Sequence, residues 1–67
     1  MFWVELQGFG QDGKPAAAKI GKPLQTIQAA KAEAYRLYNA EAYGPLVTVS
    51  AYHILDEAAK IVGKGQF

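Results

Sequence analysis

Three clusters of glycine and proline divide the chain into short segments, and this division restricts the fold more than any other feature of the sequence. The clusters lie at residues 8–15, at residues 21–23 and at Gly44 and Pro45. Because these residue types favour turns and interrupt helices and strands, we expect a turn at the first cluster, a break at Pro23 between the hairpin and a helix, and the end of that helix at Gly44 and Pro45. A chain of 67 residues without cysteine has neither disulfides nor thiolate metal sites to hold it together. We therefore expect one domain, residues 1–67, around one hydrophobic core.

The first two segments have the pattern of a β-hairpin. In residues 2–7 the even positions are apolar, and the odd positions are Trp3, Glu5 and Gln7. This alternation with period two is typical of a strand with one buried face. Residues 16–21 are expected to form the second strand, although their alanines are weak strand formers.

Residues 8–15, GFGQDGKP, raise the question of a nucleotide site, because they match the G-x-G-x-x-G pattern and the first seven positions of the P-loop. Both motifs require a helix that begins at the loop, since its free amide groups bind the phosphates. Pro15 stands where the P-loop needs serine or threonine, and residues 16–23 are too short and too broken for such a helix. We therefore predict a hairpin turn and no nucleotide cofactor.

A single helix is predicted between the second and third clusters. Thr26 is a suitable N-cap, and residues 27–42 are rich in strong helix formers. At 100° per residue the apolar positions gather on one face, so we expect the helix to pack on a sheet. These positions are Ile27, Ala30, Ala34, Leu37 and Tyr38.

After the third cluster, residues 46–52 predict a third strand in which Val47, Val49 and Ala51 share one face. The following segment is ambiguous. Residues 52–62 have apolar positions at helical spacing, whereas a turn at residues 56–59 would lead into a fourth strand at residues 60–67. We favour the hairpin, because a helix here would leave the third strand with fewer partners.

The predicted fold is therefore α+β in the order ββαββ, an antiparallel sheet of three to four strands with one helix packed on one face. The predicted core consists of Val4, Leu6, Ile20, Ile27, Ala34, Leu37, Val47, Val49 and Ile61.

Little in the sequence indicates catalysis. His53 is the single histidine, and no cysteine accompanies it as a metal ligand. Asp56 and Glu57 are adjacent, so they would point to opposite faces of a strand or both into solvent. Ser50 and Thr48 have no histidine arranged as a base. We expect no enzyme, no metal ion and no cofactor.

The sequence contains no signal-peptide pattern and no run approaching the ~18 apolar residues of a membrane span. Together with the absence of cysteine, this leads us to expect a cytoplasmic protein that does not associate with membranes.

A binding surface is expected on the sheet face that the helix does not cover. Strand parity places Trp3, Lys19 and Tyr52 there, together with Lys60 and Lys64. Exposed aromatic side chains among lysines are typical of protein interfaces and of sheet surfaces that bind RNA. Three interpretations stay open: a protein or nucleoprotein partner, a nucleic-acid partner, and a structural or self-associating domain, monomeric or homodimeric, in which Trp3 is partly covered. The net charge of +1 argues against nucleic acid as the only partner.

The segment TIQAAKAEAYRLYNAEAYGPLVTV, about a third of the chain, resembles the helix-and-strand core of a small phage- or mobile-element-encoded anti-CRISPR family that inhibits the type I-F surveillance complex. The match consists of Ile27, Ala30, Lys31, Ala34, Arg36, Gly44 and the apolar strand that follows. The resemblance implies that basic residues of the helix and of the last hairpin contact the complex or DNA. In this chain they are Lys31, Arg36, Lys60 and Lys64.

Overall fold

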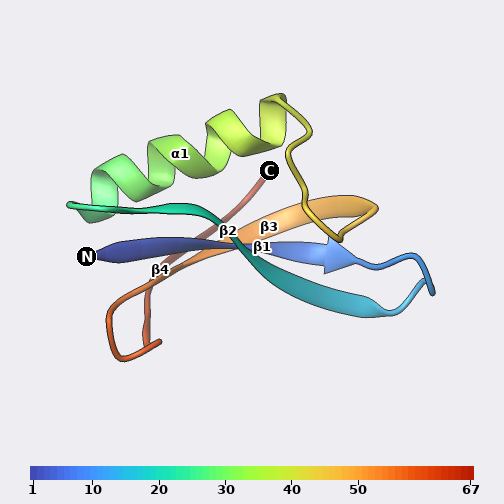
Figure 1. Cartoon of the computed structure of the whole chain (residues 1–67), viewed down its shortest axis with the longest axis horizontal. Coiled ribbons are helices and arrows are strands. Elements are labelled where there is room, and N and C mark those ends of the chain that lie inside the picture. Colours follow the sequence, from blue (N-terminus) through green and yellow to red (C-terminus); the bar gives the residue numbers. More distant parts are fainter.

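The computed structural model describes residues 1–67 and shows four strands in one antiparallel sheet, with one helix along one face (Figure 1). The elements are β1 (Phe2–Phe9), β2 (Pro15–Leu24), α1 (Ile27–Asn39), β3 (Thr48–Leu55) and β4 (Ile61–Gln66). The α+β fold in the order ββαββ is thus confirmed. The one helix, α1, has neither the length nor the apolar character required to cross a bilayer.

The strands lie in the order β2-β1-β3-β4, and each neighbouring pair is antiparallel. β1 is therefore a central strand between β2 and β3, and α1 carries the chain across it from one to the other. This arrangement is a split β-α-β unit. It leaves β2 and β4 as the two edges of the sheet.

The glycine-rich loop between β1 and β2 is a hairpin turn, as predicted. The N–H of Gly10 donates to the carbonyl of Lys14, and the N–H of Gly13 donates to the carbonyl of Gly10, both at 3.0 Å. Gly13 has a φ of 76°, which glycine adopts without strain. Since β2 begins at Pro15, no helix starts at the loop, and the arrangement that phosphate binding requires is not formed.

The N-terminus of α1 is capped by Thr26, whose side-chain oxygen accepts the N–H of Ala29 at 3.0 Å. The face turned toward the sheet buries Ala30, Ala34 and Leu37. Small alanine side chains let the helix axis approach the sheet closely, so one large side chain per turn suffices to fill the layer.

The helix ends at Asn39, earlier than the predicted residue 42, because the chain turns into a left-handed conformation at Glu41, with a φ of 53°. The N–H of Ala42 donates to the carbonyl of Leu37 at 2.9 Å, and the N–H of Glu41 donates to that of Tyr38 at 3.1 Å. These bonds form a Schellman motif. Glutamate occupies the position at which helices usually have glycine, so the sequence contained no signal for this end.

Nine buried residues form one cluster between α1 and the sheet. They are Val4, Leu6, Ala30, Ala34, Leu37, Leu46, Val49, Tyr52 and Ile54. Of the predicted core, the five residues confirmed as buried are Val4, Leu6, Ala34, Leu37 and Val49. Ile20 is partly buried against the cluster, and Ile27 is half-buried. The predictions for Val47 and Ile61 are wrong, since these residues are 55% and 50% exposed.

A β-bulge in β3 explains why the predicted faces of this strand were wrong. Gln7 of β1 pairs with Ala51, but the next residue, Gly8, pairs with Val49, so Ser50 is an extra residue. An extra residue reverses the alternation of the residues that follow it. Val49 and Tyr52 therefore both face α1, and Ala51 does not.

The bulge depends on a close approach of two backbones. A Cβ atom at Gly8 would lie 1.8 Å from the carbonyl oxygen of Thr48, a distance that no side chain tolerates. Only glycine permits β3 to come this near β1.

The ambiguous C-terminal segment is a hairpin, as favoured. The N–H of Asp56 donates to the carbonyl of Lys60 at 3.0 Å, and Oδ1 of Asp56 accepts the N–H groups of Ala58 and Lys60 at 2.9 Å. A second irregularity follows, because Ile54 pairs with Gly63 but Leu55 pairs with Ile61. The extra residue, Val62, turns Ile61 away from the core.

Candidate interaction surface

The sheet has one face that no element covers, on the side opposite α1 (Figure 1). We call it the open face. It is the face to which the odd-numbered residues of β1 and their cross-strand neighbours point. In β1 these residues are Trp3, Glu5, Gln7 and Phe9.

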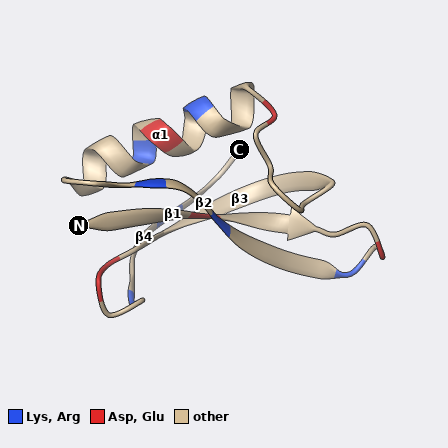
Figure 2. Ribbon diagram, viewed as in Figure 1, with Lys and Arg blue, Asp and Glu red and all other residues tan.

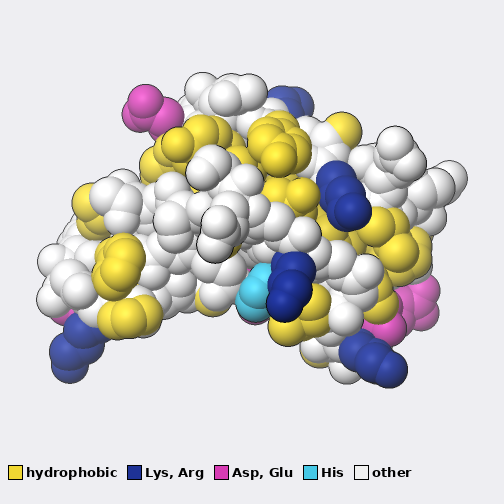
Figure 3. Space-filling view, turned by 180° about the vertical axis from the view of Figure 1, so that it is seen from behind, with side chains coloured by type: hydrophobic (Ala, Val, Ile, Leu, Met, Phe, Trp, Pro, Cys, Tyr) yellow, Lys and Arg dark blue, Asp and Glu magenta, His cyan; other side chains and the backbone are white.

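A polar row crosses the middle of the open face, one residue from each strand. Glu5 pairs with Lys19 on one side and with His53 on the other, and His53 pairs with Lys64. Oε1 of Glu5 accepts a hydrogen bond from the side-chain amide of Gln7 at 2.6 Å and lies 3.5 Å from Nδ1 of His53. The single carboxylate of the row is thus shared by two neighbours, while the lysines stand at its two ends. In the view from behind, the histidine lies beside a basic side chain (Figure 3).

Trp3 and Lys19 lie on the open face, as predicted. The ammonium of Lys19 is 5.4 Å from the centroid of the Trp3 ring, which is a cation–π contact. Trp3 is half-buried and pairs with Leu55, which is buried although it does not belong to the core cluster. The indole therefore has a packing role in addition to any contact with a partner.

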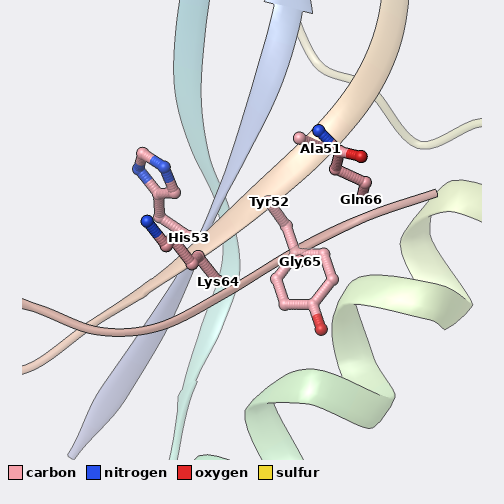
Figure 4. Close-up of a pocket in the computed structure, with 6 residues that line it drawn as sticks. All are labelled: Ala51, Tyr52, His53, Lys64, Gly65 and Gln66. Carbon is pink, nitrogen blue, oxygen red and sulfur yellow. The ribbon is translucent and has the colours of Figure 1, made fainter.

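Tyr52 was predicted on the open face, and the structure corrects this. The bulge at Ser50 turns Tyr52 toward α1, where it is 4% exposed. Its ring centroid lies 5.8 Å from that of Tyr35 and 5.3 Å from that of Phe67. Burial raises the pKa of the Tyr52 hydroxyl. Figure 4 shows its ring turned toward the helix while His53 points to the other side.

The basic residues implied by the resemblance are divided by the structure. Nε and one terminal nitrogen of the Arg36 guanidinium donate to the two carboxylate oxygens of Glu33, at 2.5 and 2.7 Å. These bonds raise the pKa of Arg36 and hold that of Glu33 below its ordinary value. Arg36 is therefore already paired within its own helix and is not a free cation for a partner.

Three of the predicted lysines surround β4. Lys60 directly precedes the strand, and Lys64 lies within it on the open face. Cε of Lys31 lies 3.5 Å from the position that a Cβ of Gly63 would occupy, so this side chain extends from α1 over the other side of β4. Figure 2 shows the remaining charged residues distributed over β1, β2, α1 and the loops, with none in β3. No lysine forms an ion pair with a carboxylate; the two ion pairs involve the N-terminus and Arg36, and the imidazole of His53 lies 3.5 Å from Glu5.

Two shallow hollows flank the His53–Lys64 pair along β4. One, of about 400 Å³, extends toward Gln66, and its lining is drawn in Figure 4. The other extends toward Ile61. β4 has glycine at positions 63 and 65, and the ring of Tyr52 occupies the space beside Gly65. The structure contains no group of three or more potential metal ligands from His, Asp and Glu.

Two surface residues were missed by the sequence reasoning. Phe9 is 45% exposed at the end of β1 and was assigned to the turn. The period-two pattern of residues 2–7 continues through Gly8 to Phe9, so this signal was present. Ile61 was assigned to the core, and no local pattern indicates the irregularity at Val62 that exposes it.

Comparison of the chain with protein-family models, with characterised proteins and with solved structures yields no match.

Proposed function

We propose that this protein is a small, non-catalytic binding domain that attaches to a protein or nucleoprotein partner through the open face. The observation that carries the proposal is the composition of this uncovered face. It combines Trp3 and the exposed Phe9 with Lys19 and Lys64, neither of which is in an ion pair. Aromatic anchors surrounded by polar groups are characteristic of protein interfaces.

A protein surface fits the open face better than nucleic acid alone. Stacking of a base requires a free aromatic ring face, and the ammonium of Lys19 already lies over Trp3. A carboxylate, Glu5, stands in the middle of the polar row, where it would repel phosphates. The net charge of +1 also gives little attraction for a polyanion. Nucleic acid is therefore the weaker alternative, as part of a nucleoprotein rather than as the sole ligand.

The most specific form of the proposal follows the resemblance of residues 26–49 to the type I-F anti-CRISPR family. In this form the protein acts in the cytoplasm and blocks a nucleoprotein complex by occupying its surface. The three lysines around β4 support it, because they provide cations toward an acidic protein patch or bound nucleic acid. A phage-plaquing assay in a strain with an active type I-F system tests it directly. Unchanged plaquing would remove this specific form and leave the general one.

A pull-down from host lysate tests the general proposal, with two variants that each lose one exposed aromatic side chain. Phe9→Ala combined with Lys19→Glu should abolish retention of the partner, because both changes lie on the open face. Tyr35→Ala is the matched control, since Tyr35 is an aromatic residue of similar exposure, 47%, on α1. Circular dichroism verifies that each variant is folded. Equal retention by both variants would mean that the open face is not the binding surface.

A further inference from the structure

We infer that β4 binds an extended, acidic segment of a partner protein, which adds to the sheet as a fifth strand. The inference rests on the proposed function, because it names the chemistry of the partner and the edge that it engages. Strand addition at an exposed sheet edge combines main-chain hydrogen bonds with side-chain contacts on both faces.

The backbone of β4 has free hydrogen-bonding groups on its outer side. The N–H of Phe67 donates to the carbonyl of Ser50 in β3 at 3.0 Å, and Gly65 and Gly63 continue this ladder. In an antiparallel pair, successive residues direct their N–H and C=O groups alternately toward the neighbour and away from it. Lys64 and Gln66 therefore direct theirs outward, since β4 is an edge strand.

The other edge of the sheet is less suited to pairing. β2 contains Pro15 and Pro23, which have no N–H group to donate. Its register with β1 also shifts between Ile20 and Leu24, where Gly21 has a φ of 83°. β4 contains no proline, so an added strand meets a continuous edge from Gly63 to Gln66.

The cations around β4 determine the charge of the segment. Lys64 lies on the open face of β4 and Lys31 on the opposite side, while Lys60 stands at its start. Side chains of an added strand point alternately to the two faces of the sheet. A carboxylate of the added strand that points to the open face would meet Lys64. A carboxylate of the added strand that points to the helix side would meet Lys31.

The acidic residues nearest to β4 form no ion pair with these lysines. Oδ1 of Asp56 accepts the backbone N–H groups of Ala58 and Lys60, and so stabilises the turn. Oε1 of Glu57 lies 2.6 Å from the N-terminal amino group. The strand itself contains no Asp or Glu. The edge is therefore cationic, and because its free groups are those of a peptide ladder, a polypeptide suits it better than a nucleic acid.

Amide hydrogen exchange and chemical-shift mapping on the labelled full chain test the inference. The probe is a capped octapeptide of alternating glutamate and threonine, with a glutamine–threonine octapeptide as the neutral control. We expect the acidic probe to slow exchange of the Lys64 and Gln66 amides, which are free in the unbound protein. Lys60→Glu with Lys64→Glu should weaken binding by about tenfold or more. Lys14→Glu with Lys22→Glu changes the net charge equally away from β4 and should leave binding unchanged.

The inference would be overturned if the acidic probe did not bind at millimolar concentration, or if the neutral probe bound equally well. It would also be overturned if the acidic probe bound without slowing exchange of the Lys64 and Gln66 amides. Tighter binding of an oligothymidine than of the acidic probe at β4 would likewise contradict it. The inference can fail while the proposed function holds. If Phe9→Ala with Lys19→Glu abolishes capture of the host partner while Lys60→Glu with Lys64→Glu does not, the open face binds and the role of β4 is wrong.

Discussion

Replacement of Leu37 by alanine should remove a large part of the stability of this domain. Leu37 is 3% exposed and is the largest side chain that α1 buries in the core. The change removes three carbon atoms, worth about 2.4 kcal/mol at ~0.8 kcal/mol per buried methylene, and the remaining cavity raises the cost to about 3 kcal/mol. A domain of this length has a free energy of unfolding of about 3–10 kcal/mol. The melting temperature should fall by about 12 to 24 °C.

The matched control is Val47→Ala, which removes apolar carbons from a residue that is 55% exposed. Its free energy of unfolding should change by no more than about 0.5 kcal/mol. Urea denaturation followed by far-ultraviolet circular dichroism measures both variants, since the signal of α1 and the sheet disappears on unfolding. A loss below about 1 kcal/mol for Leu37→Ala, or equal losses for the two variants, would refute the described core.

Three further predictions concern the backbone and one ion pair. Glu41→Gly should raise the free energy of unfolding by about 1 kcal/mol, because glycine adopts the left-handed conformation of residue 41 without strain. Gly8→Ala should lower it by about 2 kcal/mol or more, since the new Cβ collides with the carbonyl of Thr48 and separates the strands; a wild-type urea midpoint would contradict the bulge. Hydrogen bonds from Arg36 lower the pKa of Glu33 in the folded protein. These bonds therefore stabilise the fold at a pH above the ordinary glutamate pKa, and this contribution is lost as the pH falls through the lowered pKa of Glu33. Glu33→Gln should therefore reduce the urea midpoint at neutral pH but not in strong acid, and an equal reduction at both would disprove the linkage.

The order of the elements could be predicted from the sequence because each element has its own local signal. Period-two alternation indicated β1, the Thr26 cap and the run of helix formers indicated α1, and the glycine and proline clusters separated them. The register of β3 could not be predicted in this way. The bulge at Ser50 results from the contact between Gly8 and Thr48, which are distant in the sequence, and a local pattern contains no information about such a contact.

The candidate surface was predictable to the extent that it lies on a regular strand. β1 has no extra residue, so Trp3 was correctly placed on the open face from parity alone. Tyr52 follows the bulge at Ser50 and Ile61 directly precedes the irregularity at Val62, and both predictions failed for this reason. The pairing of Arg36 with Glu33 was also missed, although residues three apart on a helix are neighbours and the sequence contained this signal.

The two glycines of β4 divide the molecule into parts of unequal stability. Gly63 and Gly65 bury no side chain of their own, and the ring of Tyr52 from β3 occupies the space beside Gly65. Ordering each glycine costs about 0.5–1 kcal/mol more than ordering alanine. β4 should therefore detach and reattach as a separate cooperative unit, at a lower free energy than global unfolding. When it is detached, β3 becomes the edge of a three-stranded sheet, and Tyr52 loses its contacts with Gly65 and Phe67.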